Sequence, residues 1–277
     1  MDATESCVPI DFRAVCTAVK EKRKAQGVIP PEILSAIASS KRLALGELAG
    51  KDSVAAMVKA YDDGVFDAVI PVVIRTGTEY GSTNFIDRNV SVVRRKTGGV
   101  VSKPVVMQDF EFWHALNGRF VSELSRRFGF YSPCLGCHLY LHAMRVPLAL
   151  LVGARSIVSG ERETHDGKQK INQLPFSLDF HEQLTSKWNI QLNLSLRHVS
   201  SELEVDRILG GACSSKDQFC CVFSGNYRTP DGRIGVPVEA VRRFYAEYGF
   251  PVAQKAVEAL LTNPQINLLK LVGESFK

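Results

Sequence analysis

One segment of the sequence limits the fold more than any other: two short apolar runs that flank a helical pattern. Residues 43–48 form the first run, and residues 68–74 form the second. Between them, apolar side chains from Val54 to Tyr61 recur at the spacing of one helical face. A strand, a tight turn, a helix and a second strand make a right-handed βαβ unit. The segment therefore predicts an α/β fold with a mainly parallel, doubly wound sheet.

Further runs of the same kind extend this pattern towards the C-terminus. Apolar runs predict strands at 105–107, 156–159 and 190–196, and helical spacing predicts helices at 112–128, 139–151 and about 180–187. We expect about five strands in total, with residues 43–75 and 156–196 in one sheet.

The remaining segments are assigned to the ends of the chain and to one insertion. Residues 1–42 predict a helical N-terminal extension, and residues 236–277 predict closing helices packed on the same domain. Residues 43–235 form the α/β domain itself. Within it, residues 89–93 alternate like a strand, and two glycines follow, so we interpret residues 81–104 as a β-hairpin insertion.

Charge and hydropathy narrow the function classes only slightly. The 277 residues include 34 Lys and Arg against 29 Asp and Glu, a net charge of +5 that permits a polyanionic partner without arguing for one. The longest apolar run, 146–154, is far shorter than the ~20 residues that cross a bilayer. With seven cysteines and no secretion signal, we expect a cytosolic protein with thiols or metal ligands and no membrane association.

The turn of the βαβ unit carries the residues Gly50, Lys51, Asp52 and Ser53. It lies at the carboxyl end of a strand, where doubly wound sheets bind their ligands. Backbone N–H groups at the start of the next helix attract phosphate, and glycine lets the backbone approach closely. An ordinary turn with Asp52 or Ser53 as helix cap explains these residues equally well. In either case we expect Asp52 and Ser53 to be exposed.

A Cys-x-x-Cys motif, Cys134 and Cys137, is the second feature with chemical content. Two thiolates at a helix start bind one soft metal ion or a cluster, and the helix N-terminus lowers the thiol pKa. A third thiolate from Cys213, Cys220 or Cys221 would leave one coordination position open. Because adjacent residues of a strand face opposite ways, only one of Cys220 and Cys221 should be a ligand. Ordinary buried thiols are the alternative.

The helix after this motif predicts a polar stripe. Cys134, His138, His142 and Arg145 fall close to one another on a helical face, so the histidines and the arginine could face an anionic ligand. Surface histidines without a function explain His138 and His142 equally well.

A dense polar run, residues 159–173, follows the predicted strand at 156–159. It should lie on the same sheet edge as the phosphate turn, so we expect Gly50 and Gly160 to share that edge. Arg162 and Lys168 could hold phosphates, and Asp166 could bind magnesium. An exposed charged loop is the alternative interpretation.

Residues 48–53 resemble the SGGxDS signature of the PP-loop ATP pyrophosphatases, which cleave ATP between the α and β phosphates and adenylate a substrate. Gly50, Asp52 and Ser53 match the signature, whereas Leu48 and Ala49 replace its first serine and first glycine. The replacement of that serine removes one hydroxyl donor to pyrophosphate. The resemblance implies that residues 43–235 form a nucleotide-binding domain that uses ATP and Mg²⁺.

The middle of the chain resembles the sulfur-transferring branch of that superfamily, the tRNA thiouridine and thiocytidine synthetases. The resemblance rests on the Cys-x-x-Cys motif, on Arg145 and on the turn from Ser159 to Glu161. It implies a [4Fe-4S] cluster held by Cys134, Cys137 and a later cysteine, Cys221 or alternatively Cys220. The implied site residues are the catalytic Asp52, Cys134 and Cys137, together with the ATP-binding Gly50, Lys51, Asp52, Ser53, Gly160, Glu161, Arg162, Asp166 and Lys168.

The leading hypothesis is therefore an ATP-dependent sulfur transferase that takes sulfur from a separate donor. Its acceptor is a tRNA base, contacted by the basic residues 94–96 and 242–243, or a small molecule. The alternative is an adenylating ligase of a small carboxylate or amide, with zinc at the cysteines. A third hypothesis is a nucleotide-sensing partner without enzymatic activity. A homodimer is compatible with each of them.

Overall fold

The computed structural model describes residues 7–276, and its centre is a sheet of seven parallel strands. The strand order is β1-β6-β3-β2-β7-β8, and β5 pairs with the first residues of β3. The strands are β1 (Val8–Pro9), β2 (Leu43–Glu47), β3 (Ala68–Arg75), β5 (Val100–Val101), β6 (Val105–Gln108), β7 (Ser156–Val158) and β8 (Gln191–Asn193). The predicted fold class, a doubly wound and mainly parallel α/β sheet, is confirmed.

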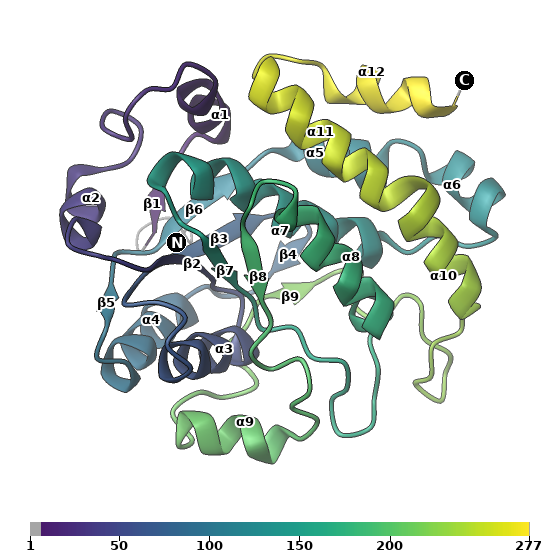
Figure 1. Cartoon of the computed structure of the whole chain (residues 1–277). Helices are drawn as coiled ribbons and strands as arrows, with labels where there is room; N and C mark the ends of the chain where they lie inside the picture. The colour runs from purple at the N-terminus through teal and green to yellow at the C-terminus, as the bar shows by residue number, and fades with distance from the viewer. Residues whose placement is uncertain (1–6, 277) are drawn as a thin grey trace.

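Helices cover both faces of this sheet (Figure 1). One face packs against α3 (Lys51–Asp62), α4 (Phe85–Lys96) and α9 (Glu202–Leu209). The other face is covered by α1 (Phe12–Lys20), α7 (Pro133–Val152) and α8 (Pro175–Ser186). Helix α11 (Phe250–Thr262) packs on the outside of these three helices. The shorter helices are α2 (Pro31–Ile37), α5 (Phe110–Trp113), α6 (Val121–Phe128), α10 (Val238–Phe244) and α12 (Leu268–Gly273).

Strand β3 shows why both faces are covered. Val69 and Val73 point into the apolar cluster under α3 and α4, whereas Ile70, Val72 and Ile74 point into the cluster under α7. Successive side chains of a strand face opposite ways, so a strand that is apolar at nearly every position needs a helix layer on each side.

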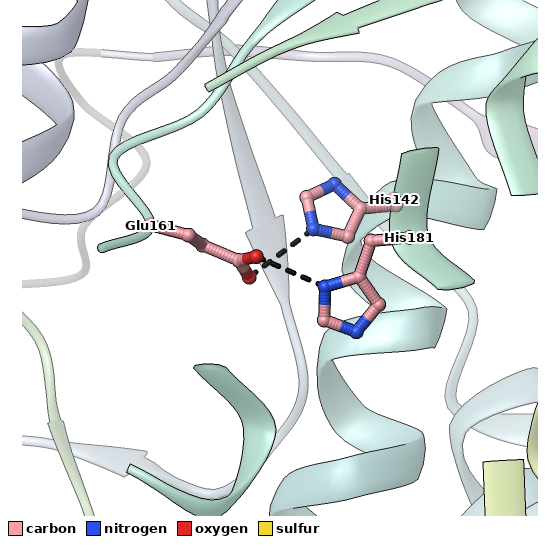
Figure 2. Close-up of side chains that lie close together, drawn as sticks. All are labelled: His142, Glu161 and His181. Carbon is pink, nitrogen blue, oxygen red and sulfur yellow. Dashed lines mark hydrogen bonds and ion pairs between the residues drawn. The ribbon is translucent and has the colours of Figure 1, made fainter. Parts of the chain in front are cut away.

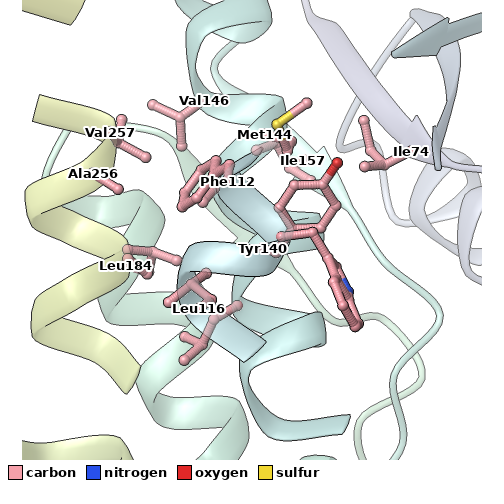
Figure 3. Close-up of a cluster of buried hydrophobic side chains, with 14 of the residues drawn as sticks. Ile74, Phe112, Leu116, Tyr140, Met144, Val146, Ile157, Leu184, Ala256 and Val257 are labelled. Atoms are coloured by element: carbon pink, nitrogen blue, oxygen red, sulfur yellow. The ribbon is translucent and has the colours of Figure 1, made fainter. Parts of the chain in front are cut away.

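Helix α7 is the centre of the larger core. Figure 3 shows Tyr140, Met144 and Val146 of this helix between sheet residues such as Ile157 and the α11 residue Val257. The helix is long and apolar enough to cross a membrane, but two thirds of its most apolar window is buried inside the protein. It is therefore a core helix of this domain.

The predicted βαβ unit and its neighbours are confirmed, with small differences at the edges. Residues 43–75 and 156–193 lie in one sheet, because β2 pairs with β3 on one side and with β7 on the other. Seven strands replace the expected five because β1 and β5 are only two residues long, too short to leave a periodic pattern. The chain order changes direction at β2, which makes its carboxyl end the switch point of the sheet.

The predicted β-hairpin at 81–104 is wrong. Residues 85–96 form helix α4, which buries Phe85, Ile86, Asn89, Val90 and Val93 at helical spacing against α3. The β-branched residues of this segment favour strands locally, but packing against α3 outweighs that preference. The N-terminal extension is helical as expected, with Asp11 capping α1, yet it also contributes β1 to the sheet. Residues 1–6 of that extension lie outside the described residues.

A small antiparallel ribbon lies beyond the end of β3. It pairs β4 (Glu79–Tyr80) with β9 (Cys220–Cys221). This pairing brings two cysteines from late in the chain to the carboxyl edge of the sheet.

The turns after β2 and β7 lie at the same edge, as the sequence predicts for Gly50 and Gly160. Gly160 packs directly against the backbone of α3: a methyl group placed on it would lie 2.4 Å from the Ser53 nitrogen. Backbone atoms cannot move aside as a flexible side chain does.

We therefore expect Gly160→Ala to lower the free energy of unfolding by about 1–3 kcal/mol, the usual cost of overpacking. The matched control is Gly273→Ala in α12, where the added methyl group meets only ordinary contacts with Phe120. Urea unfolding followed by circular dichroism measures both variants. Equal stability of the two would contradict the close approach of β7 to α3.

Candidate functional site

A cavity of about 480 Å³ opens at the carboxyl ends of β2 and β3. Its walls come from six parts of the chain: the β2–α3 turn, the end of β3 with β4, Trp113 of α5, the start of α7, the polar loop after β7, and residues 218–227 around β9. The polar and sulfur-bearing residues around it include Glu47, Thr76, Thr78, Glu79, Cys134, Cys137, His138, Arg145, Lys170, Asn172, Gln173, Cys220 and Cys221. This is the size and the place that ligand sites of doubly wound folds have.

Ser53 stabilises the turn between β2 and α3, residues 50–53. The hydroxyl of Ser53 accepts hydrogen bonds from the N–H groups of Ala49 and Gly50, each at 3.0 Å, and donates one to the Gly50 carbonyl. Ser53 is only 3% exposed, so the prediction that it is exposed is wrong. The backbone N–H groups of Lys51 and Asp52 take no acceptor among residues 7–276, and neither residue lines the cavity.

The charged side chains of this turn form ion pairs within the protein. Lys51 contacts Asp206 at 2.7 Å, and Asp52 contacts Arg162 at 3.3 Å. Arg162 also binds Glu202, and its side chain is fully buried. Burial raises the pKa of Asp52, although Arg162 opposes the shift. None of these side chains lines the cavity.

Two cations line the cavity, Lys170 and Arg145, and Arg145 pairs with Glu47. Lys170 has no such partner, since no carboxylate among the described residues pairs with its ammonium group. Burial lowers its pKa, and the charge of Asp52 opposes the shift. An unpaired, half-buried ammonium beside a cavity is a candidate ligand for an anion. From the sequence, Lys168 was predicted to hold phosphate. The charge density of the loop does not show which of its lysines faces the cavity.

Four cysteines from two distant segments line the same cavity, one of them the exposed Cys220. Cys134 and Cys137 lie in the first turn of α7, and Cys221 lies on β9. The Cys134 thiol is 3.9 Å from the Phe223 carbonyl, two residues beyond Cys221. The indole N–H of Trp113 donates to Cys137 at 3.5 Å, and the Thr78 hydroxyl lies 3.3 Å from the Cys221 sulfur.

The expectation that the helix start lowers the pKa of these thiols is wrong. Burial raises the pKa of Cys134 to about 11, and it raises the pKa of Cys137 even further. Without a metal both thiols therefore stay protonated at neutral pH and are poor nucleophiles.

The cysteines around the cavity do not form a compact group of metal ligands among the described residues. Among residues 7–276, two groups of three side chains bring ligand atoms within 4.8 Å of one another, and neither contains a cysteine. A single ion needs all its ligands around one centre, whereas the cysteines of an iron–sulfur cluster bind different irons. Cys220 is exposed at the cavity wall, and Cys213 is buried against Asn89.

A buried ion pair forms part of the cavity wall. Arg145 of α7 is 1% exposed and lies 3.5 Å from Glu47 at the end of β2. Glu47 also accepts hydrogen bonds from the Ser159 hydroxyl at 2.6 Å and from the Gly160 N–H at 3.0 Å. Arg145 was predicted to face this edge; Glu47 was missed, because a single acidic residue ending an apolar strand carries no motif.

The polar loop after β7 divides into buried and exposed parts. Glu161 is buried and faces His138, His142 and His181. Asp166 and Lys168 lie on an exposed turn away from the cavity, where Asp166 accepts a hydrogen bond from the Glu202 N–H.

The two basic clusters lie on helices outside the cavity. The cluster at 94–96 ends α4, and the cluster at 242–243 lies on α10. Arg94 donates to the Ser102 carbonyl, while Arg242 and Arg243 pair with Glu239 and Glu247. Each of these arginines therefore already has a partner within the chain.

The buried Glu47–Arg145 ion pair should contribute to the free energy of unfolding. Arg145→Met leaves the Glu47 carboxylate buried without its counter-charge, so we expect the free energy of unfolding to fall by about 3–5 kcal/mol. Adding Glu47→Gln removes the unpaired charge and should restore at least half of that loss. Urea unfolding of the single and double variants measures the effect. A double variant that is less stable than Arg145→Met would contradict it.

Comparison with known proteins places the chain in a family without assigning an activity. No protein-family model matches it. The uncharacterized protein MJ0009 of Methanocaldococcus jannaschii is 36% identical over 219 residues, which cover 77% of this chain and 79% of that protein. Identity at this level over most of both chains means a shared fold and descent. The chain therefore belongs to the same family as MJ0009.

Proposed function

We propose that this protein is an ATP-dependent, AMP-forming sulfur transferase. The observation that carries the proposal is one cavity that has the β2–α3 turn on one side and Cys134, Cys137 and Cys221 on the other. These groups are far apart in the sequence, and their meeting at the switch point of the sheet is what a two-substrate reaction on ATP and sulfur needs.

The nucleotide side of the proposal rests on two groups. The free N–H groups of Lys51 and Asp52 at the start of a twelve-residue helix attract phosphate oxygens. Lys170 offers an unpaired positive charge to the same ligand.

The proposed reaction has two steps. An acceptor carbonyl oxygen attacks the α-phosphorus of ATP, the bond to the β-phosphate breaks, and pyrophosphate leaves. Hydrosulfide then attacks the activated carbon, AMP leaves with the original oxygen, and loss of the sulfur-bound proton gives the thiocarbonyl. Magnesium supplies charge neutralisation on the leaving pyrophosphate.

The sulfur side of the proposal rests on the cysteines. Cys134, Cys137 and Cys221 line one cavity and could hold a [4Fe-4S] cluster with one iron free of protein ligands. When bound, such a cluster would supply the binding position for hydrosulfide. Because cluster binding deprotonates the thiols, it also removes the unfavourable pKa of Cys134 and Cys137.

The acceptor and the cellular setting belong to the same proposal. We propose a tRNA base or a small carbonyl compound as acceptor, a separate sulfur donor, and a reducing cytosolic setting that keeps the seven thiols unpaired. Mass spectrometry for thiolated nucleosides in RNA that copurifies with the protein distinguishes the two acceptors.

The first test concerns the nucleotide. Lys170→Met removes the unpaired charge, so we expect the KM for ATP to rise about tenfold to hundredfold, the value of a hydrogen bond to a charged group. Lys168→Met, an identical change on the exposed part of the same loop, should leave KM within twofold. Release of AMP and pyrophosphate is the readout; release of ADP by the wild type would contradict α–β cleavage.

The second test concerns sulfur. After anaerobic reconstitution with iron and sulfide, Cys134→Ser, Cys137→Ser and Cys221→Ser should each lose the visible absorption of the cluster and the sulfur transfer. Cys213→Ser should keep both, because its thiol is buried away from the cavity.

The same reconstitution separates the proposal from its alternative. A wild type that binds stoichiometric zinc at the cysteines, takes up no cluster and still forms AMP would favour an adenylating ligase. A wild type that binds no ATP would end both enzymatic hypotheses.

A further inference from the structure

Three of the six histidines of the chain meet at one carboxylate. His138 and His142 come from α7 and His181 comes from α8, and all three reach Glu161, which follows β7. The distances from Glu161 oxygens are 2.6 Å to His138 Nδ1, 3.2 Å to His142 Nε2 and 2.9 Å to His181 Nδ1. Figure 2 shows the rings of His142 and His181 directed at the carboxylate.

The arrangement is deeply buried. His142 and His181 are 0% exposed and Glu161 is 2% exposed, whereas His138 lines the cavity. The ligand atoms of His142, Glu161 and His181 all lie within 4.8 Å of one another. The set thus lies directly behind the cavity wall, with His138 between it and the cavity.

The spacing of these atoms matches a small tetrahedral ion. Zinc binds histidine nitrogen and carboxylate oxygen at about 2.0–2.2 Å, which separates neighbouring donor atoms by about 3.3 Å. His142 Nε2 lies 3.2 Å from one Glu161 oxygen and His181 Nδ1 lies 2.9 Å from the other, so small movements of these side chains would bring the three ligands around one ion.

The local charge also favours a cation. Two buried carboxylates, Glu47 and Glu161, lie around a single buried guanidinium, Arg145. Burial would raise the pKa of Glu161, but His181, His142 and His138 outweigh it and hold the pKa well below its ordinary value. Burial lowers the pKa of His181 to about 4.

The hydroxyl of Tyr245 contacts His181 on the side of the ring away from Glu161. This contact is with Nε2 at 3.3 Å, and Tyr245 is fully buried. A partner on the second ring nitrogen fixes the orientation and tautomer of a metal-binding histidine.

The second group of potential metal ligands among the described residues already contains a counter-charge. Asp52, His165 and Glu202 also bring ligand atoms together, but Arg162 already pairs with both carboxylates. A guanidinium fills that position, so no ion is needed there.

We propose that His142, Glu161 and His181 bind a divalent transition-metal ion of the zinc class, distinct from the cysteine site. His138 closes the side towards the cavity as a fourth ligand or through a bound water. The ion joins α7, α8 and the end of β7, and it does not depend on sulfur transfer or on ATP.

The test uses the full chain in which Cys134→Ser and Cys137→Ser remove the competing thiols. We expect this variant to bind one equivalent of Zn²⁺ by elemental analysis. With Co²⁺ as the probe, its spectrum should show the d–d bands of nitrogen and oxygen ligands without thiolate charge transfer. No stoichiometric ion, or a cobalt spectrum with thiolate bands, would overturn the proposal.

Substitutions then assign the ligands. Glu161→Gln keeps the shape of the side chain and should weaken Zn²⁺ binding at least hundredfold, while His138→Gln should weaken it about 10-fold to 100-fold. His198→Gln, at a histidine that is 81% exposed, should bind as the parent does. Zn²⁺ should raise the Tm of the parent and of His198→Gln but not that of Glu161→Gln.

The design does not rely on every variant folding. If Glu161→Gln fails to fold, the cobalt spectrum of the parent still identifies the ligand type. Retention of zinc with parental affinity in a folded Glu161→Gln would refute the site. Because the cysteine variant lacks the proposed cluster site, zinc binding there and sulfur transfer in the wild type can fail independently.

Discussion

The carboxylate of Glu47 is the interaction on which the edge of this sheet depends. It ends β2, pairs with Arg145 of α7, and accepts hydrogen bonds from Ser159 and Gly160 after β7. A buried carboxylate is costly unless each of its partners is present, so these three elements hold one another at fixed spacing. The close packing of Gly160 on α3 and the shape of the cavity wall both follow from this arrangement.

The sequence predicted the parts of the fold that are encoded locally. The strands β2, β3, β6 and β7 and the helix α3 leave clear periodic patterns, and they lie where we expected. Residues 85–96 were predicted wrongly, because a segment rich in valine fits a period of two almost as well as a helical period. Only the contact with α3, which no local pattern contains, decides between them. The two-residue strands β1 and β5 are likewise defined by their partners alone.

For the candidate site, the sequence predicted where the motifs lie but not which side chains pair with one another. The motifs drew attention to the turn at 50–53 and to Cys134 and Cys137, and these do lie around one switch point of the sheet. The partners of individual side chains could not be predicted from the sequence. Glu161 faces three histidines from two helices, and Arg162 forms ion pairs with Asp52 and Glu202. Composition shows that a loop is charged, but only the tertiary structure shows which charges remain without a partner.

Helix α7 connects the two proposed ligand sets through its own geometry. Cys134 and Cys137 occupy its first turn, and His138 and His142 follow on the next turns, four residues apart. Residues four apart lie above one another on a helix, so His138 faces the cavity while His142 lies one turn deeper, behind the wall. Soft thiolates at the open end and imidazoles at the closed end select different metals. We therefore expect the helix to take part in both proposed sites, the cysteines beside the ribbon strand β9 and the histidines beside Glu161 after β7.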